Sequence, residues 1–473
     1  MFLFPTVLIY INFIFIVYLF EVKKLAKQNA KDLTVGSPTK LILGFLVPLL
    51  FGLLFQQVYN LVDTVIVGKY LGVTALAGVG ATGSINFLIL GFCNGTCSGF
   101  SIPVAQQYGA KDFKALKKYV GNAVVLAIIF AGIVTLLTTT LCHQILAWMH
   151  TPDDIVSMSY DYIFVIFAGI PFTVLFNLLS GFIRSLGDSK TPLIFLIICS
   201  FLNIGMDLLF ILKFGMGVKG AGLATIIAQA ISGILCLILV VKKFDLLHIT
   251  KEDLKLSPHF SHTLIRMGFP MGFQFSITAI GSVILQTNLN TLGSIYVAAN
   301  TAAIRISGIL MCPLDALGQT MATYSGQNIG AGKIDRIGKG LKSANIMGWI
   351  YSTLALFIAF FLGKYIILAF VDAKETDVIK YAFQLLVTNI AFYYFLVEVG
   401  NIRSTIQGIG FSGFSLFSGV SEMIARTLIG AVFIPLFGFN AACFASPFAW
   451  VLADIFLVPG YYHCMKKIKA RHQ

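Results

Sequence analysis

The chain has 473 residues, of which 58% are hydrophobic and 11% are charged, and its formal net charge is +13. These values exclude a soluble globular protein, in which about 25% of residues are charged. Positive charge in a soluble protein would suggest a nucleic-acid partner, but here the cations lie in short loops between apolar runs and are explained by membrane orientation.

Residues 1–36 precede the predicted core and begin with an apolar run rich in Phe and Ile. A basic stretch follows, with Lys23, Lys24, Lys27 and Lys31. The run lacks the basic start and the small-residue cleavage site that are typical of a signal peptide. Two interpretations stay open: a thirteenth helix, or translation that starts nearer Val22 or Leu25. We treat the segment as an appendage to the core.

The core is predicted to be an all-α integral membrane fold with twelve transmembrane helices, because apolar runs of about 20 residues recur without the alternation of a membrane β-barrel. The first half is expected to span the membrane at 40–66, 76–105, 119–142, 158–183, 191–212 and 219–241, and the second at 264–290, 297–325, 344–370, 378–402, 412–435 and 440–463. The expected bundles are 37–241 and 263–465, with a linker at 242–262 and a basic tail at 466–473.

The cations fall on alternate loops. The basic set is Lys111, Lys114, Lys117, Lys118, Arg184, Lys190, Lys242, Lys243, Lys251, Lys255, Lys333, Arg336, Lys339, Lys342, Arg403, Lys466, Lys467, Lys469 and Arg471. The opposite set is Lys69, Lys213, Lys219, Lys364, Lys374 and Lys380. Because positive loops face the cytoplasm, the start of the first core helix and the C-terminus are predicted to be cytoplasmic. The expected location is a cell membrane, which the chain crosses many times.

The two halves repeat at a spacing of about 222 residues. Gly44–Pro48 recurs as Arg266–Pro270, Leu71–Gly72 as Leu292–Gly293, Gln106–Ala110 as Gln327–Ala331, and Arg184–Gly187 lies opposite Gln407–Gly410. Repeats of six helices enter the membrane in the same sense, so they are parallel repeats. Two similar bundles facing a central cavity can alternate between inward-open and outward-open forms, which favours a secondary transporter over a constant pore.

Four polar residues of the first half lie inside predicted spans. Asp63 is in the first helix, Asn203 and Asp207 share one face of the fifth, and Thr225 is in the sixth. A charge at mid-bilayer costs about 2.5 kcal/mol or more, so each carboxylate needs a partner or a function. If these helices adjoin, their oxygens suit a hard monovalent cation, or the carboxylates could carry protons. The alternative is a pair of structural aspartates near helix ends.

The second half offers fewer polar residues. Asp315, Glu398 and Asp454 could line a cavity for cationic solutes or extend toward the membrane surface, and Gln57 and Asn60 of the first helix are further cavity candidates. Glu422 and Arg426 have the spacing of a structural ion pair on one helix. The eight cysteines lack metal-ligand spacing, so no metal site beyond a bound Na⁺, and no cofactor, is expected.

A series of stretches carries a family resemblance: Pro48, Gln57–Thr64, Gly68–Gly72, Gln106–Asp112, Gly181–Pro192, Asn203–Asp207 and Gly220–Thr225. With them the chain resembles the multidrug and toxic compound extrusion (MATE) transporters, and among these the bacterial DinF-like branch. The likeness extends from about residue 37 to residue 465.

This resemblance implies a secondary antiporter that exports organic cations and drugs in exchange for H⁺ or Na⁺. It implies a cation site made of Asp63, Asn203, Asp207 and Thr225. Some family members also use an acidic residue on the seventh helix, where this chain has Gln274, so an ion site on that pattern is not expected in the second half. Small cationic amphipathic substrates, membrane lipids and a monomeric state are expected, without nucleic acid.

The main alternative is a flippase for lipids or lipid-linked saccharides, which a groove rich in Arg and Lys would favour. Arg305 and Arg426 are nearly the only candidates for such a groove. A major facilitator transporter fits less well, because the Gln107–Lys118 loop lacks its Gly, Asp and Arg/Lys-rich motif. An enzyme is not expected, since the sequence has no P-loop, H-E-x-x-H motif or nucleophile elbow.

Overall fold

The computed structural model describes residues 31–149 and 151–472, and the candidate N-terminal helix lies outside these ranges. The described residues form helices and turns, without a β-strand. Ten helices are long and apolar enough to cross a membrane, and two bent helix pairs bring the number to twelve. The prediction of an all-α fold with twelve core spans is confirmed.

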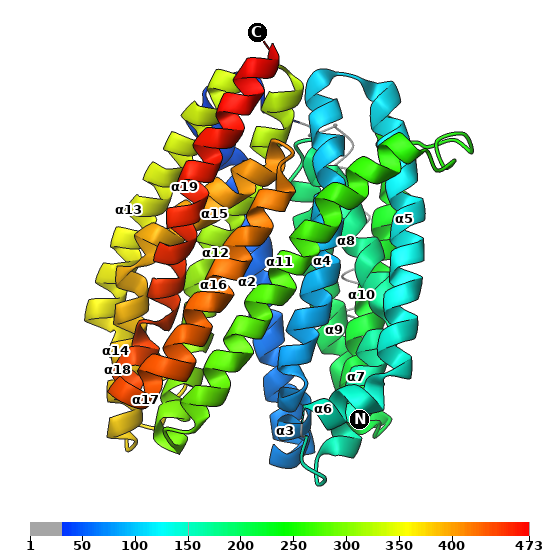
Figure 1. The fold of residues 1–473 in the computed structure, drawn as a ribbon. Helices are drawn as coiled ribbons and strands as arrows, with labels where there is room; N and C mark the ends of the chain where they lie inside the picture. The colour runs from blue at the N-terminus through cyan, green and yellow to red at the C-terminus, as the bar shows by residue number, and fades with distance from the viewer. Residues whose placement is uncertain (1–30, 150, 473) are drawn as a thin grey trace. The chain divides into compact units, whose positions relative to one another are not determined.

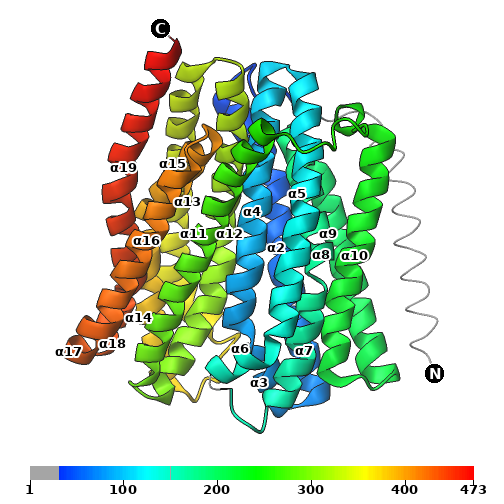
Figure 2. The same ribbon diagram turned by 45° about the vertical axis from the view of Figure 1, so that its right-hand side comes forward.

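The chain divides into two compact units, each described by itself. Unit 1 comprises Phe51–Leu264 and, among the other described residues, Lys31 and Asp32. Its elements are α2 (Pro38–Leu71) from Phe51 onward, α3 (Val73–Ala81), α4 (Gly83–Ala110), α5 (Phe113–Thr140), α6 (Cys142–Trp148), α7 (Val156–Ala168), α8 (Ile170–Ser185), α9 (Lys190–Leu208), η1 (Leu209–Lys213), α10 (Gly217–Lys243) and η2 (Asp245–Leu247). Figures 1 and 2 show α8, α9 and α10 side by side.

Among the described residues, unit 2 comprises Leu33–Leu50 and the chain from Ile265 to His472, so that the first part of α2 belongs to it. Its other elements are α11 (Pro258–Asn290) from Ile265 onward, α12 (Ser294–Gly330), α13 (Ile334–Ile367), α14 (Thr376–Ala391), α15 (Tyr393–Gly408), α16 (Ser412–Leu428), η3 (Ile429–Phe433), α17 (Ile434–Phe437), α18 (Phe439–Cys443) and α19 (Ala445–His472). Because α19 extends to His472, most of the predicted basic tail continues the twelfth helix.

The fourth helix of each half is broken, and the prediction of continuous helices at 158–183 and 378–402 was wrong in this respect. The pair α7 and α8 bends by 46°, and the pair α14 and α15 bends by 50°. Pro171 lies at the start of α8, where a proline removes a backbone hydrogen bond and favours a bend. The second break, at Phe392, has no proline beside it.

Backbone geometry repeats between the halves as well. The fifth helix of each half, α9 or α16, continues into a π-helical turn, η1 or η3. Positive φ angles recur at the spacing of the sequence repeat, in the pairs Gly72 and Gly293, Lys111 and Gly332, Gly187 and Gly410, and Gly217 and Gly438. Positive φ favours glycine, so these seven glycines, with Lys111 as the eighth position, mark equivalent turns in two copies of one motif.

The apolar core of unit 1 fixes α2 against its neighbours. The cluster comprises Ile66 and Val67 of α2, Ala75 of α3, Tyr162, Val165 and Ile166 of α7, Ile211 of η1, and Val218, Ala221 and Ile226 of α10. Gly222 permits close approach, since a Cβ there would lie 3.2 Å from the Tyr162 carbonyl oxygen. This packing holds the end of α2 that follows Asp63 beside α7, η1 and α10.

The linker between the halves is anchored on α5 within unit 1. The Asn122 side-chain amide donates to the carbonyl oxygens of Asp253 and Lys255, both at 3.3 Å. Its Oδ1 accepts from the Ser257 backbone N–H at 2.9 Å. A Cβ on the neighbouring Gly121 would lie 2.2 Å from the Asp253 carbonyl oxygen. The linker therefore lies directly on the α5 backbone.

The chain that leads into α2 is anchored in a corresponding way within unit 2. The Leu33 backbone N–H donates to Gln327 Oε1 at 2.9 Å, and Asn328 Nδ2 donates to the Leu33 carbonyl at 3.2 Å. Lys333 Nζ donates to the Thr34 carbonyl at 2.9 Å. The end of α12 and the turn after it thus hold the segment before α2.

Candidate functional site

Two carboxyl groups meet inside unit 1. Asp63 of α2 and Asp207 of α9 are close enough to share a hydrogen bond. Asp207 is fully buried and Asp63 is partly buried. Asp63 Oδ1 and both Asp207 oxygens are buried and find no donor among the described residues. Because two ionised carboxylates repel each other, this arrangement calls for a proton or a cation between them.

A second polar pair uses the same helix. Asn203 Nδ2 donates to Thr225 Oγ1 of α10 at 3.2 Å, and Thr225 Oγ1 donates to the Ala221 carbonyl at 3.1 Å. Asn203 Oδ1 is buried without a donor in the described part of the chain. Asn203 and Asp207 share one face of α9. The structure therefore joins Asp63 to Asp207 and Asn203 to Thr225, and α9 carries one member of each pair.

Two tyrosines that the sequence analysis did not select lie near both carboxylates, namely Tyr59 of α2 and Tyr162 of α7. Tyr59 is four residues before Asp63 and so lies on the same helix face, a signal that the sequence does contain. Tyr162 is contributed by a different helix, and its spacing in the sequence gives no indication of this position.

The remaining candidates of α2 differ in exposure, since Gln57 is partly buried and Asn60 is exposed. The Asn60 backbone carbonyl accepts from Thr64 Oγ1 at 2.8 Å. Both residues lie on the part of α2 that belongs to unit 1.

The three acidic cavity candidates of unit 2 also differ in exposure. Asp315 of α12 is exposed, Glu398 of α15 is partly buried and Asp454 of α19 is 6% exposed. Arg403 of α15 acts electrostatically on both Asp315 and Asp454. Two of the three carboxyl groups, those of Asp315 and Asp454, therefore lie near one arginine that the sequence analysis treated only as a loop cation. Glu398 acts electrostatically on Asp454.

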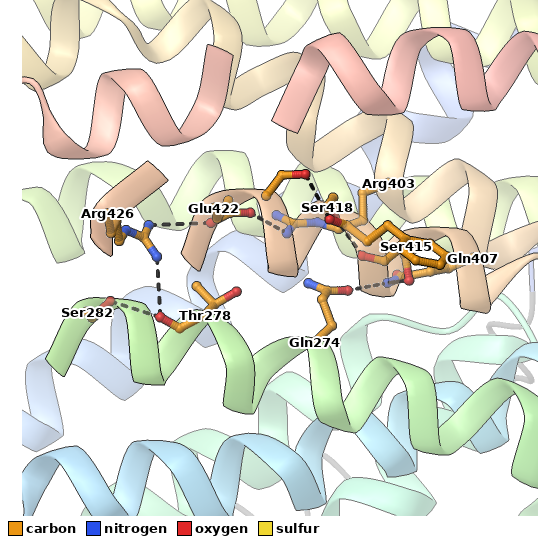
Figure 3. Close-up of polar contacts among 11 residues, drawn as sticks. Gln274, Thr278, Ser282, Arg403, Gln407, Ser415, Ser418, Glu422 and Arg426 are labelled. Atoms are coloured by element: carbon orange, nitrogen blue, oxygen red, sulfur yellow. Dashed lines mark hydrogen bonds and ion pairs between the residues drawn. The ribbon is translucent and has the colours of Figure 1, made fainter. Parts of the chain in front are cut away.

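Glu422 of α16 is the centre of a buried ion-pair network in unit 2. Arg426 Nη2 lies 3.4 Å from Glu422 Oε2, and Arg403 Nη1 lies 2.9 Å from Glu422 Oε1. Beside them, Gln407 Nε2 donates to Gln274 Oε1 at 2.8 Å. Figure 3 shows these contacts between α11, α15 and α16. At Gln274, where the resemblance leads one to look for an acid, a neutral amide pair is found.

Comparison with known proteins identifies relatives over nearly the whole chain. The MatE family model matches twice, over residues 48–209 and 270–435. The probable multidrug resistance protein YoeA of Bacillus subtilis (strain 168) is 27% identical over 90% of this chain and 93% of its own. The multidrug export protein MepA of Staphylococcus aureus (strain MSSA476) is 21% identical over 87% of this chain and 90% of its own.

A solved structure supports the same fold. A crystal structure of MATE in complex with MaL6 superposes with a TM-score of 0.87, at 21% identity, over 94% of this chain and 100% of that one. Since the family model matches the two halves separately, the internal repeat is a property of the fold itself.

Proposed function

The chain belongs to the MatE family of multi-pass membrane transporters, and from this membership we propose that it is a secondary active antiporter. It exports organic cations and drugs in exchange for H⁺ or Na⁺, by alternating access of its two six-helix halves. The observation that carries the proposal is the Asp63–Asp207 carboxyl pair of α2 and α9, in which Asp63 Oδ1 and both Asp207 oxygens are buried without a donor among the described residues.

The carboxyl pair supports coupling between ion movement and substrate transport, because its charge changes when a proton or a cation binds. Two adjacent carboxylates that are shielded from water are unstable until a proton or a cation neutralises one of them. An ion can bias a conformational equilibrium only through its different affinity for the two conformations. Binding at Asp63 and Asp207 would bend α2 and favour the form that releases substrate outside, and loss of the ion would reverse this change.

The nearby oxygens bear on the identity of the ion. A proton needs only the two carboxyl groups, whereas Na⁺ prefers several oxygen ligands. Asn203 Oδ1 is a buried acceptor without a donor in the described ranges, and it lies on the same face of α9 as Asp207. The site can therefore serve either ion, and the choice between them is experimental.

The substrate class follows from the relatives' names together with unit 2. Both relatives are described as multidrug resistance or export proteins. In this chain Asp315 is exposed and Glu398 is partly buried, and we propose that their carboxylates attract a cationic substrate. We expect small, amphipathic cations to be transported.

The test is efflux of fluorescent cations from vesicles that contain the full chain, with proton and sodium gradients imposed separately. Asp63→Asn and Asp207→Asn should abolish gradient-driven transport while the protein stays folded. Asp153→Asn, which changes an exposed aspartate in the turn before α7, is the matched control and should transport normally. Normal efflux by Asp63→Asn would refute the mechanism.

Experiments with the same vesicles distinguish the flippase alternative from the antiporter. A flippase requires cationic side chains that are available to a phosphate group. Of the two candidates from the sequence, Arg426 is paired with Glu422, whereas Arg305 of α12 is exposed. Movement of a fluorescent phospholipid between leaflets, without gradient-driven drug efflux, would favour the flippase.

A further inference from the structure

Asp454 is a buried acid of unit 2 that the proposed antiport does not use. It lies on α19, it is 6% exposed, and both carboxyl oxygens are buried with no hydrogen-bond donor in the described part of the chain. A carboxylate without a donor or counter-ion is costly to bury. The group must therefore be protonated, or neutralised by a cation close to it.

The charged groups around Asp454 come from two neighbouring helices. They are Glu398 and Arg403 of α15 and Glu422 of α16. Helices α14 and α18 also contact α19. The charged residues of α14, Asp377 and Lys380, are exposed near its first turn, and α18 carries no charged residue. Arg403 is thus the cation on which an ionised Asp454 depends.

Arg403 is already bound to another acid. Its Nη1 lies 2.9 Å from Glu422 Oε1, and its side chain is 17% exposed against 4% for Glu422. On the other side of Glu422, Arg426 binds Oε2 and also donates to the Thr278 carbonyl at 3.3 Å (Figure 3). Glu422 therefore contacts two arginines, whereas Asp454 has no hydrogen bond to either within the described residues.

The charges around Asp454 favour neither its protonated nor its ionised state strongly. Two arginines with Glu422 carry one excess positive charge. Asp454 and the exposed Asp315 compete for this charge, since Arg403 acts on both. Glu398 adds a further negative charge from α15 and opposes ionisation of Asp454. Interacting groups of this kind titrate as a unit, and a small change of environment moves the proton.

We propose that Asp454 is a proton-binding site of unit 2, with Arg403 as the group that neutralises it after the proton leaves. In the protonated state Asp454 is neutral and Arg403 binds Glu422, as observed. On deprotonation the proton passes to water, and the carboxylate shares the Arg403 guanidinium with Glu422. The five N–H donors of a guanidinium allow two carboxylates to be bound at once.

The use of this proton in transport rests on the proposed antiport, but its existence does not. The acid belongs to α19 and not to the seventh helix, where the Gln274 side-chain amide is bound to Gln407. With the Asp63–Asp207 pair in unit 1, each half would then hold a group whose charge follows the proton concentration.

The test is infrared spectroscopy of the full chain in lipid vesicles during a pH titration, because a protonated carboxyl group has a C=O band that the carboxylate lacks. Asp454→Asn should remove one component of this band. With Asp454 intact, Arg403→Gln should make the component persist to higher pH by about one unit or more, since a nearby cation favours the carboxylate. Glu398→Gln should move it to lower pH.

The matched control is Asp315→Asn, which removes an exposed carboxyl group near the same arginine and should leave the Asp454 component in place. Spectra of Asp454→Asn that superpose on those of the unchanged protein at every pH would overturn the proposal. If Asp454→Asn fails to fold, an unchanged titration in both Arg403→Gln and Glu398→Gln would overturn it. Normal gradient-driven efflux by Asp63→Asn, with the Asp454 band component intact, would count against the antiport and not against this site.

Discussion

The carboxyl group of Asp207, in the last turn of α9, meets that of Asp63 on α2, and the π-helical turn η1 begins two residues later. The second half has the same backbone irregularity, since α16 continues into η3. There the residue in the last turn is Arg426, bound to Glu422. The last turn before the π-helical turn thus carries a buried acid, Asp207, in the first half and a buried arginine, Arg426, in the second.

Ion-dependent stability should depend on the carboxyl pair. A ligand that binds only the folded state stabilises it by about 2.7 kcal/mol at 100 times its dissociation constant. We expect the melting temperature of the unchanged protein to rise with Na⁺ or with acidification, and Asp63→Asn and Asp207→Asn to lose this response. The measurement is thermal unfolding in NaCl and in choline chloride at several pH values. An unaltered response in both variants would show that the ion binds elsewhere.

Among the charged residues of unit 2, Glu422 should lower the free energy of unfolding most when it is replaced. Glu422→Gln leaves Arg403 and Arg426 with a neutral partner, and removing one member of a buried ion network costs about 3–5 kcal/mol. Asp335→Asn, which breaks the exposed 4.0 Å pair with Lys469, is the control and should cost less than about 1 kcal/mol. Denaturant unfolding in detergent compares the two variants. Equal losses of unfolding free energy would contradict a larger contribution of the buried network to stability.

Two glycines of α5 should respond in opposite ways to alanine. A Cβ at Gly121 would lie 2.2 Å from the Asp253 carbonyl oxygen, so Gly121→Ala should displace the linker and cost about 1–3 kcal/mol. Gly132 has no atom within 4 Å of the added Cβ, and alanine there should stabilise the helix by about 0.5–1 kcal/mol. Melting temperatures test the signs, and proteolysis of the linker should accelerate in Gly121→Ala alone.

The contacts that hold the linker, residues 242–262, should weaken at low pH. The Thr250 backbone N–H donates to Asp253 Oδ2 at 2.8 Å and holds the pKa of that carboxyl below its ordinary value, helped by the Thr250 hydroxyl and by Lys117 and Lys118. A depressed pKa means that the stabilisation is complete above the unfolded value, about 3.9, and is lost as pH falls through the folded one.

Hydrogen exchange of residues 250–257 measures this loosening. Protection should fall below about pH 4 in the unchanged protein and should be low at neutral pH in Asp253→Asn. Glu252→Gln, at the neighbouring exposed position, should behave like the unchanged protein. Protection in Asp253→Asn equal to that of the unchanged protein at neutral pH would show that the carboxylate does not hold the linker.

The sequence predicts what depends on hydropathy and on residue spacing along one helix. The twelve spans and the shared face of Asn203 and Asp207 are of this kind. What depends on contacts between helices was not predicted: Tyr162 near the carboxyl pair, the Arg403–Glu422 bond and the break at Phe392. Arg403 in particular was assigned to a loop, because its buried partner is contributed by a different helix.

The anchoring of Leu33 has a consequence for synthesis of the chain. Its partner Gln327 follows 294 residues later, so the segment that leads into α2 leaves the ribosome long before the groups that will bind it exist. The first half must therefore enter the membrane with its leading segment undocked. Folding is completed by a late, long-range closure, which makes this step slow relative to local helix pairing.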